Sequence, residues 1–191
     1  MDKGDYDSAI KEFNKAVEID SKDVYSWNSL ALAYKLSGEF DMALECLDKA
    51  IFIAPKDIYN YNSKAIILFQ RGQLEDAKFV IEQALLSTPE NHLLLGNLGE
   101  IQMREEDFRG ARKTFTKIAK TYPDKSIGHY SLGNLEVEEG NLSTALIYFK
   151  KAESLDTNSW KIKAALASVQ QELGHIDEAI SNYEQAISLE N

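Results

Sequence analysis

The residue types that most often carry catalysis or bind metals are scarce in this chain and widely spaced. Its three histidines, His92, His129 and His175, do not have the spacing of metal ligands, and the single cysteine, Cys46, adds no cluster. No nucleophile stands beside a base in a recognisable pattern. We therefore expect no metal site, no cofactor and no catalytic residue.

Two other patterns suggest chemistry but are better explained by structure. The stretch GNLGE (residues 96–100) has the glycines of a phosphate-binding loop, yet it follows no predicted strand and lacks a GK[ST] ending. Both glycines fall inside a predicted helix, where close packing explains them. The acidic pairs Glu105–Glu106 and Glu138–Glu139 lie at predicted helix ends, where carboxylates are usually solvated. We predict that the chain is not an enzyme.

Composition points to a globular, acidic protein. Of 191 residues, 44% are hydrophobic and 27% are charged, with 31 acidic against 21 basic residues and a net charge of −10. This charge repels nucleic acid and anionic membranes, so neither is an expected partner. No apolar run approaches the roughly 20 residues of a membrane helix, and residues 1–10 do not have the layout of a signal peptide. A cytoplasmic location is therefore predicted.

One period organises the whole chain. The only three prolines, Pro55, Pro89 and Pro123, stand 34 residues apart. The same period places an alanine series and a turn series, in which one glutamate replaces glycine: Ala9, Ala43, Ala77, Ala111, Ala145 and Ala179; and Gly4, Gly38, Gly72, Glu106, Gly140 and Gly174. Apolar residues between these markers follow helical spacing. A period of this length with helical patterning predicts a stack of helix–turn–helix units.

The second unit carries the most complete set of markers. It reads WNSLALAY over residues 27–34 and continues with Gly38, Ala43, Ala50 and Pro55. This skeleton resembles the tetratricopeptide repeat family, and the resemblance extends over the whole chain. It implies an all-α fold, a right-handed α-solenoid of antiparallel helix pairs. Residues 1–191 then form a single solenoid, with a half repeat at 1–23, full repeats at 24–57, 58–91, 92–125 and 126–159, and a last repeat at 160–191.

The register also predicts where each helix begins and how paired helices pack. First helices should begin near residues 24, 58, 92, 126 and 160, and second helices just after each turn residue. Small residues should face one another within a pair, namely Ala31, Ala65, Gly99, Gly133 and Ala167 against the alanine series. Larger side chains such as Phe115 and Phe149 should fill the space beside them. Glycines in or beside two of the first helices, Gly96, Gly99, Gly128 and Gly133, lower helix stability. Gln102 and Glu136 also replace an aromatic core position of the family. We therefore expect lower local stability, seen as faster amide exchange, over 92–139 than over 24–91.

The resemblance implies a protein–protein interaction scaffold that binds a peptide or helix in the concave groove lined by the first helices. The family's groove positions correspond to Tyr25, Asn28, Leu32, Tyr59, Asn62, Ile66, Phe69, Leu93, Asn97, Glu100, Tyr130, Asn134 and Glu138. Asparagine can donate to and accept from a peptide backbone, and tyrosine gives rigid apolar contact. One subset of the family grips a chain-terminal carboxylate with basic residues, but the matching positions here are not basic, so no such clamp is expected.

A second candidate surface is basic. Residues 108–121 contain Arg109, Arg112, Lys113, Lys117 and Lys120 and no acidic residue. This segment is the second helix of its unit, which lies on the outer surface in the family. It is either an ordinary solvated face or a docking strip for an acidic partner.

Two alternatives stay open at this stage. The chain could be the repeat segment of a larger multidomain protein, including a regulatory part of an enzyme, or a self-assembly module. Apolar residues at both ends of the array predict a homodimer through the terminal helices, in preference to an open filament. The pentatricopeptide family has a similar period, but its RNA contacts need a basic channel that this acidic chain does not offer.

Overall fold

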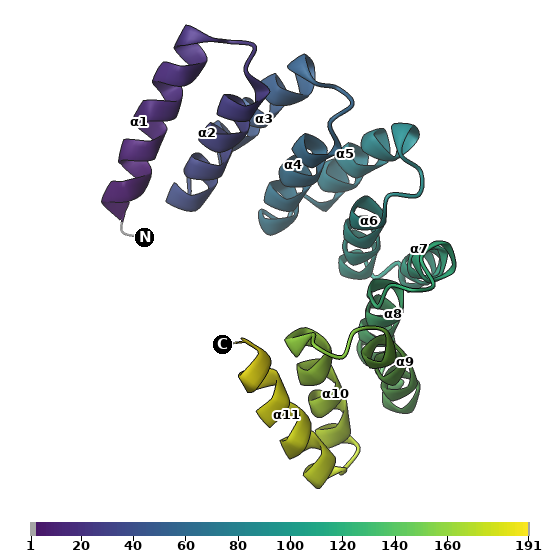
Figure 1. Cartoon of the computed structure of the whole chain (residues 1–191). Coiled ribbons are helices and arrows are strands. Elements are labelled where there is room, and N and C mark those ends of the chain that lie inside the picture. The colour runs from purple at the N-terminus through teal and green to yellow at the C-terminus, as the bar shows by residue number, and fades with distance from the viewer. Residues whose placement is uncertain (1–2, 191) are drawn as a thin grey trace. The chain divides into compact units, whose positions relative to one another are not determined.

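The computed structural model describes residues 3–190, and within that range all regular structure is helical (Figure 1). The eleven helices are α1 (Lys3–Ile19), α2 (Val24–Ser37), α3 (Phe40–Ile53), α4 (Ile58–Gln70), α5 (Leu74–Ser87), α6 (His92–Arg104), α7 (Phe108–Thr121), α8 (Ile127–Glu138), α9 (Leu142–Leu155), α10 (Trp160–Glu172) and α11 (Ile176–Glu190). The predicted all-α fold class is confirmed. The outermost residues of the predicted array, 1, 2 and 191, lie outside the described residues.

Helix boundaries follow the predicted register closely. The first helices of the pairs (the A helices) are α2, α4, α6, α8 and α10, and they begin at the expected residues except α8, which begins at Ile127, one residue late. The second helices (the B helices) α3, α5, α7, α9 and α11 each begin two residues after the turn residue. The exception is α1, the B helix of the half repeat, which begins at Lys3 and therefore includes Gly4 rather than following it.

The turn between A and B helices needs a left-handed residue. Gly38 has φ +89°, and its backbone N–H donates to the carbonyl of Lys35. Glycine reaches this conformation without the steric cost that a Cβ imposes. Glu106 occupies the same place in its repeat and takes φ +60°. The turn around Glu106 keeps the same bonding, since the N–H of Glu106 donates to the carbonyl of Met103 at 3.0 Å.

The described chain forms two compact units, residues 3–89 (unit 1, α1–α5) and residues 90–190 (unit 2, α6–α11). The core of unit 1 includes Leu30, Ala43 and Leu47, which are almost fully buried where α2 packs on α3. In unit 2, Phe149 and Leu166 belong to a buried cluster shared by α9 and α10. Neighbouring helices therefore supply each other's core, as expected for helix pairs that cannot bury an apolar face alone.

Paired helices approach closely at the predicted small residues. A Cβ on Gly133 of α8 would lie 2.5 Å from Cε1 of Phe149 on α9, and Gly99 stands in the same relation to Phe115. Both phenylalanines are 1% exposed. At the equivalent places in unit 1, alanines on the A helices accompany smaller B-helix residues: Ala31 with Leu47, and Ala65 with Ile81. Glycine with phenylalanine and alanine with leucine or isoleucine thus fill similar space.

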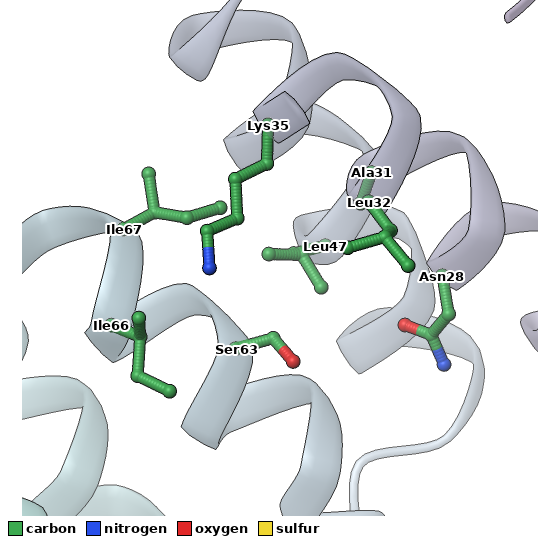
Figure 2. A pocket seen from close by; sticks show the side chains of 8 residues that line it. All are labelled: Asn28, Ala31, Leu32, Lys35, Leu47, Ser63, Ile66 and Ile67. Carbon is green, nitrogen blue, oxygen red and sulfur yellow. The ribbon is translucent and has the colours of Figure 1, made fainter. Parts of the chain in front are cut away.

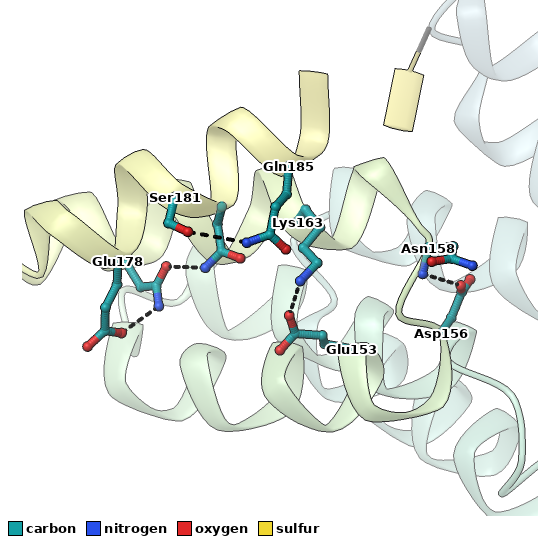
Figure 3. A network of polar contacts seen from close by, with 9 residues as sticks. Glu153, Asp156, Asn158, Lys163, Glu178, Ser181 and Gln185 are labelled. Atoms are coloured by element: carbon teal, nitrogen blue, oxygen red, sulfur yellow. Dashed lines mark hydrogen bonds and ion pairs between the residues drawn. The ribbon is translucent and has the colours of Figure 1, made fainter. Parts of the chain in front are cut away.

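The polar residues at the family's aromatic core position all have partners. Thr114 Oγ1 donates to Gln102 Oε1 at 2.8 Å, and Asn141 Nδ2 donates to Glu136 Oε2 at 3.0 Å. One repeat later, Gln170 donates to Glu178 at 2.7 Å and accepts from Asn182 at 2.8 Å. Figure 3 shows Glu178 on α11 in this polar network. Satisfied polar groups cost far less than orphaned ones. The lower stability expected over 92–139 stays a prediction.

The Gly133–Phe149 contact predicts opposite effects for two glycine-to-alanine changes. Gly133→Ala should lower the free energy of unfolding by about 1–3 kcal/mol, because the new methyl group displaces the buried ring. Gly96→Ala on α6 should raise it by up to about 1 kcal/mol, since a Cβ there meets no atom within 4 Å and alanine favours helix. Urea denaturation followed by circular dichroism gives both values. Adding Phe149→Leu should recover part of the Gly133→Ala loss, and stabilisation by Gly133→Ala alone would contradict the packing account.

Candidate partner-binding groove

The A helices of unit 1 present two exposed tyrosines at equivalent places. Tyr25 on α2 is 78% exposed, and Tyr59 on α4, one period later, is 64% exposed. Each lies in the first turn of its helix, where an aspartate cap fixes the backbone. Asp23 accepts from the backbone N–H of Tyr25 at 3.2 Å, and Asp57 accepts from that of Tyr59 at 3.0 Å. These caps hold both rings at the start of the A-helix face.

A hydrogen bond from a neighbouring side chain lowers the pKa of Asp23, the cap of α2. The hydroxyl of Ser26 donates to the carboxylate of Asp23, and this bond is the main cause that lowers the pKa of Asp23. Hydrogen bonds to the charged form favour that form. The cap therefore stays ionised, and able to accept from the helix backbone, throughout the neutral range.

A pocket lies further along the same helices. Its residues are Asn28, Ala31, Leu32 and Lys35 of α2, Leu47 of α3, and Ser63, Ile66 and Ile67 of α4, around a cavity of about 100 Å³. Figure 2 shows the amino group of Lys35 pointing into this space above Ser63. We call it the α2–α4 pocket. It brings together three residues that the sequence predicted, Asn28, Leu32 and Ile66, with two polar residues that the prediction missed, Lys35 and Ser63.

Helical spacing in the sequence could have predicted Lys35 and Ser63. Lys35 lies seven positions after Asn28 and three after Leu32, which puts all three on one helical stripe. Ser63 lies four positions after Tyr59 and three before Ile66. The remaining predicted residues of unit 1, Asn62 and Phe69, are half-buried on α4.

The predicted groove residues of unit 2 are more mixed. On α6, Leu93 and Glu100 are exposed and Asn97 is half-buried. On α8, Glu138 is exposed and Asn134 is half-buried. Tyr130 is also half-buried, and its ring packs against Phe149 with the centroids 5.8 Å apart. Tyr130 therefore adds to the core of its helix pair, unlike the two exposed tyrosines of unit 1.

The predicted basic strip divides into two groups. Arg109, Lys113, Lys117 and Lys120 are exposed and recur every three or four residues, so they follow one stripe of α7. Arg112 lies off that stripe. Its guanidinium pairs with Glu136, whose side chain is 5% exposed, and with Glu139. Arg112 is therefore engaged inside unit 2, and the surface strip consists of the other four residues.

The cysteine and two of the histidines pack within the fold and show no arrangement suited to catalysis. Cys46 is buried, and burial, assisted by the charge of Glu45, raises the pKa of its thiol to about 11. A thiol of that kind is a poor nucleophile at neutral pH. His92 packs edge-on against Tyr122 at 5.1 Å and His129 stacks on Tyr148 at 6.2 Å, and burial lowers the pKa of both imidazoles. Among residues 3–190, no group of three metal-binding side chains comes together.

Four sequence models of one repeat family match successive parts of the chain. A TPR repeat model matches residues 1–38, and three tetratricopeptide repeat models match residues 24–57, residues 97–159, and residues 58–91 together with 161–191. The chain belongs to the tetratricopeptide repeat family. The models leave only residues 92–96 and 160 unmatched, so the predicted family membership is confirmed along nearly the whole sequence.

Solved structures share this tetratricopeptide repeat fold. A tetratricopeptide repeat protein from Parabacteroides merdae aligns with a TM-score of 0.78 at 20% identity, over 97% of this chain and 74% of that one. The type IV pilus biogenesis factor PilW gives 0.76 at 21% identity, over 95% and 84%. Yeast Tom70 gives 0.78 at 22% identity, over 94% of this chain but 39% of its own. At these identities the likeness is one of fold. Curated proteins gave no match.

The described helices include none that combines the length and the apolar character needed to cross a membrane.

The ion pairs of Arg112 predict that one arginine of α7 is structural and another is not. Arg112→Met should lower the free energy of unfolding by about 1–3 kcal/mol, because it removes two charge-assisted bonds and leaves Glu136 buried with fewer partners. Arg109→Met, with the same change of charge on the exposed stripe, should stay within about 0.5 kcal/mol of wild type. Chemical denaturation of both variants is the measurement. Equal effects would show that the Glu136 pairing contributes nothing.

Proposed function

We propose that this tetratricopeptide repeat chain is a non-catalytic interaction module that binds a segment of a partner protein on the α2–α4 face of unit 1. The observation that carries the proposal is the exposure of Tyr25 and Tyr59 at equivalent places on α2 and α4, the two A helices that line the α2–α4 pocket. Large aromatic side chains contribute most to interfaces when they are rigid and become well packed against the partner. Leu32, 55% exposed, lines the pocket and adds apolar surface to the stripe of α2 that contains Tyr25.

The same face offers polar contacts for a peptide backbone. Asn28 and Ser63 lie on the two helices that border the pocket, and both can donate and accept hydrogen bonds. A cavity of about 100 Å³ holds one side chain rather than a cofactor, since small-molecule sites usually measure ~300–1,000 Å³. The proposal therefore includes the absence of catalysis and of a resident cofactor. It also includes a cytoplasmic location, and this part rests on the sequence alone.

Within unit 1, Asn62 and Phe69 belong to the proposal as secondary contacts. The predicted groove residues of unit 2 are proposed as a separate contact surface of that unit: Leu93, Asn97, Glu100, Tyr130, Asn134 and Glu138. The four-residue strip on α7 is a separate candidate for docking an acidic partner, supported by its exposure and uniform charge.

Self-association is a second candidate function, and one observation favours it. On α11, Ile176, Ile180, Tyr183 and Ile187 recur every three or four residues and are 37–63% exposed. This stripe is apolar enough to receive another helix. A second copy of the chain, pairing like-to-like through α11, would give a closed dimer. Light scattering over a concentration series tests it, and a constant monomer mass at high micromolar concentration would reject it.

The groove proposal is tested by two matched pairs of aromatic substitutions. Tyr25→Ala with Tyr59→Ala should reduce affinity capture of the partner at least tenfold, because two accessible contact residues are lost. Phe52→Ala with Phe79→Ala should leave capture unchanged, since these residues, 86% and 61% exposed, lie on the B helices α3 and α5. Quantitative mass spectrometry of captured proteins gives the comparison. Both variants should keep the wild-type circular dichroism spectrum, because all four side chains are exposed.

The proposal fails if the tyrosine pair can be removed without loss of capture. If only the Phe52→Ala and Phe79→Ala variant loses capture, the binding surface lies on the B helices instead.

A further inference from the structure

The α2–α4 pocket contains a cation without a counterion. Lys35 is half-buried, its amino group points into the pocket, and it has no ion-pair or hydrogen-bond partner for its side chain within residues 3–190 (Figure 2). Other basic residues of unit 1 that lie near acids are paired: Lys64 with Asp48, and Arg71 with Asp41. The side chains of Asn28 and Ser63 likewise have no hydrogen-bond partner among the described residues. Three polar groups around one cavity are therefore available to a ligand.

The floor of the pocket is apolar. Ala31, Leu47 and Ile67 are 1–2% exposed at its base, while Leu32 and Ile66 form its sides. A cavity of about 100 Å³ with this apolar floor has room for a branched aliphatic side chain. A cation beside such a floor adds selectivity for a negative charge close to the aliphatic group, because a charge-assisted bond is stronger than a neutral one.

We propose that the α2–α4 pocket recognises two residues of an extended partner segment. One is aliphatic, and the other is an internal aspartate or glutamate that lies two positions before or after it. The aliphatic side chain fills the cavity, and the acidic side chain pairs with Lys35. Residues i and i+2 of an extended chain project to the same side, so one strand can deliver both groups. This inference rests on the proposed function, because it names the partner chemistry of the same face.

The spacing on α2 sets the length of the bound segment. Tyr25 and Lys35 are ten positions apart on α2, a distance of about 15 Å along the helix axis. A segment that contacts the exposed tyrosines and also reaches Lys35 therefore spans roughly five extended residues. In the proposed complex the segment continues beyond Lys35, so the carboxylate beside the ammonium belongs to a side chain.

The test is selection of random peptides displayed on phage, in which each peptide is joined to the coat protein and offers no free carboxyl terminus. Wild type should enrich peptides that have an aliphatic residue and an acid two positions apart, in either order. Lys35→Met keeps the apolar stem of the side chain but removes its charge, and it should abolish the preference for the acid. Lys49→Met is the matched control, since Lys49 is exposed on α3 and does not line the pocket.

The strongest binder is then synthesised with capped ends, as its glutamate and its glutamine version. The glutamine peptide should bind wild type about tenfold more weakly, the size of a charge-assisted bond in a partly exposed site, and both should bind Lys35→Met equally.

The outcomes separate the two proposals. Peptides without acids, an acid preference that survives Lys35→Met, or selection only from a second library displayed with free carboxyl termini would each overturn this inference while leaving peptide binding intact. Failure to select any peptide on wild type from either library, or binders that ignore the Tyr25→Ala and Tyr59→Ala changes, would overturn both.

Discussion

The close approach of the two helices in each pair is the constraint on which the rest of the structure depends. The helices can approach because a small residue on the A helix meets a B-helix residue whose larger side chain fills the space beside it, as Gly133 meets Phe149. The core-facing stripe of each A helix is committed to this contact and to the neighbouring pair. The opposite stripe is therefore left for other uses, and in unit 1 it carries Tyr25, Leu32 and Tyr59.

The candidate site follows from this division of faces. On α2, Leu30, Ala31 and Tyr34 are buried, whereas the stripe containing Asn28, Leu32 and Lys35 borders an open pocket. A single helix thus supplies core packing on one side and the side chains of the proposed binding face on the other. Across the same pocket α4 presents Ser63 and Ile66, of which Ile66 lies one period after Leu32. Binding surfaces of this type can change their specificity through exposed residues without disturbing the contacts that fix the fold.

Backbone features could be predicted from the sequence better than side-chain partners. The period predicted the helix starts to within a residue or two, and Gly99 and Gly133 lie at packing positions as expected. The packing explanation also given for Gly96 is wrong, because a Cβ there would meet no atom within 4 Å. Long side chains were harder, because their direction depends on neighbours far away in sequence. Arg112 looked like a surface cation until Glu136, 24 residues later, proved to be its partner. Asn60 is fully buried at a position where other repeats have Leu94 and Ile162, and no pattern predicted it.

The central claim is that partners bind the α2–α4 face rather than the B helices, and site-specific photo-crosslinking tests it most directly. A benzophenone amino acid replaces Leu32 in one variant and Phe79 of α5 in the other, both exposed positions that tolerate a large side chain. After irradiation in cells that express the protein, the account predicts a discrete protein adduct from position 32 and none from position 79. An adduct from position 79 together with none from position 32 would contradict it.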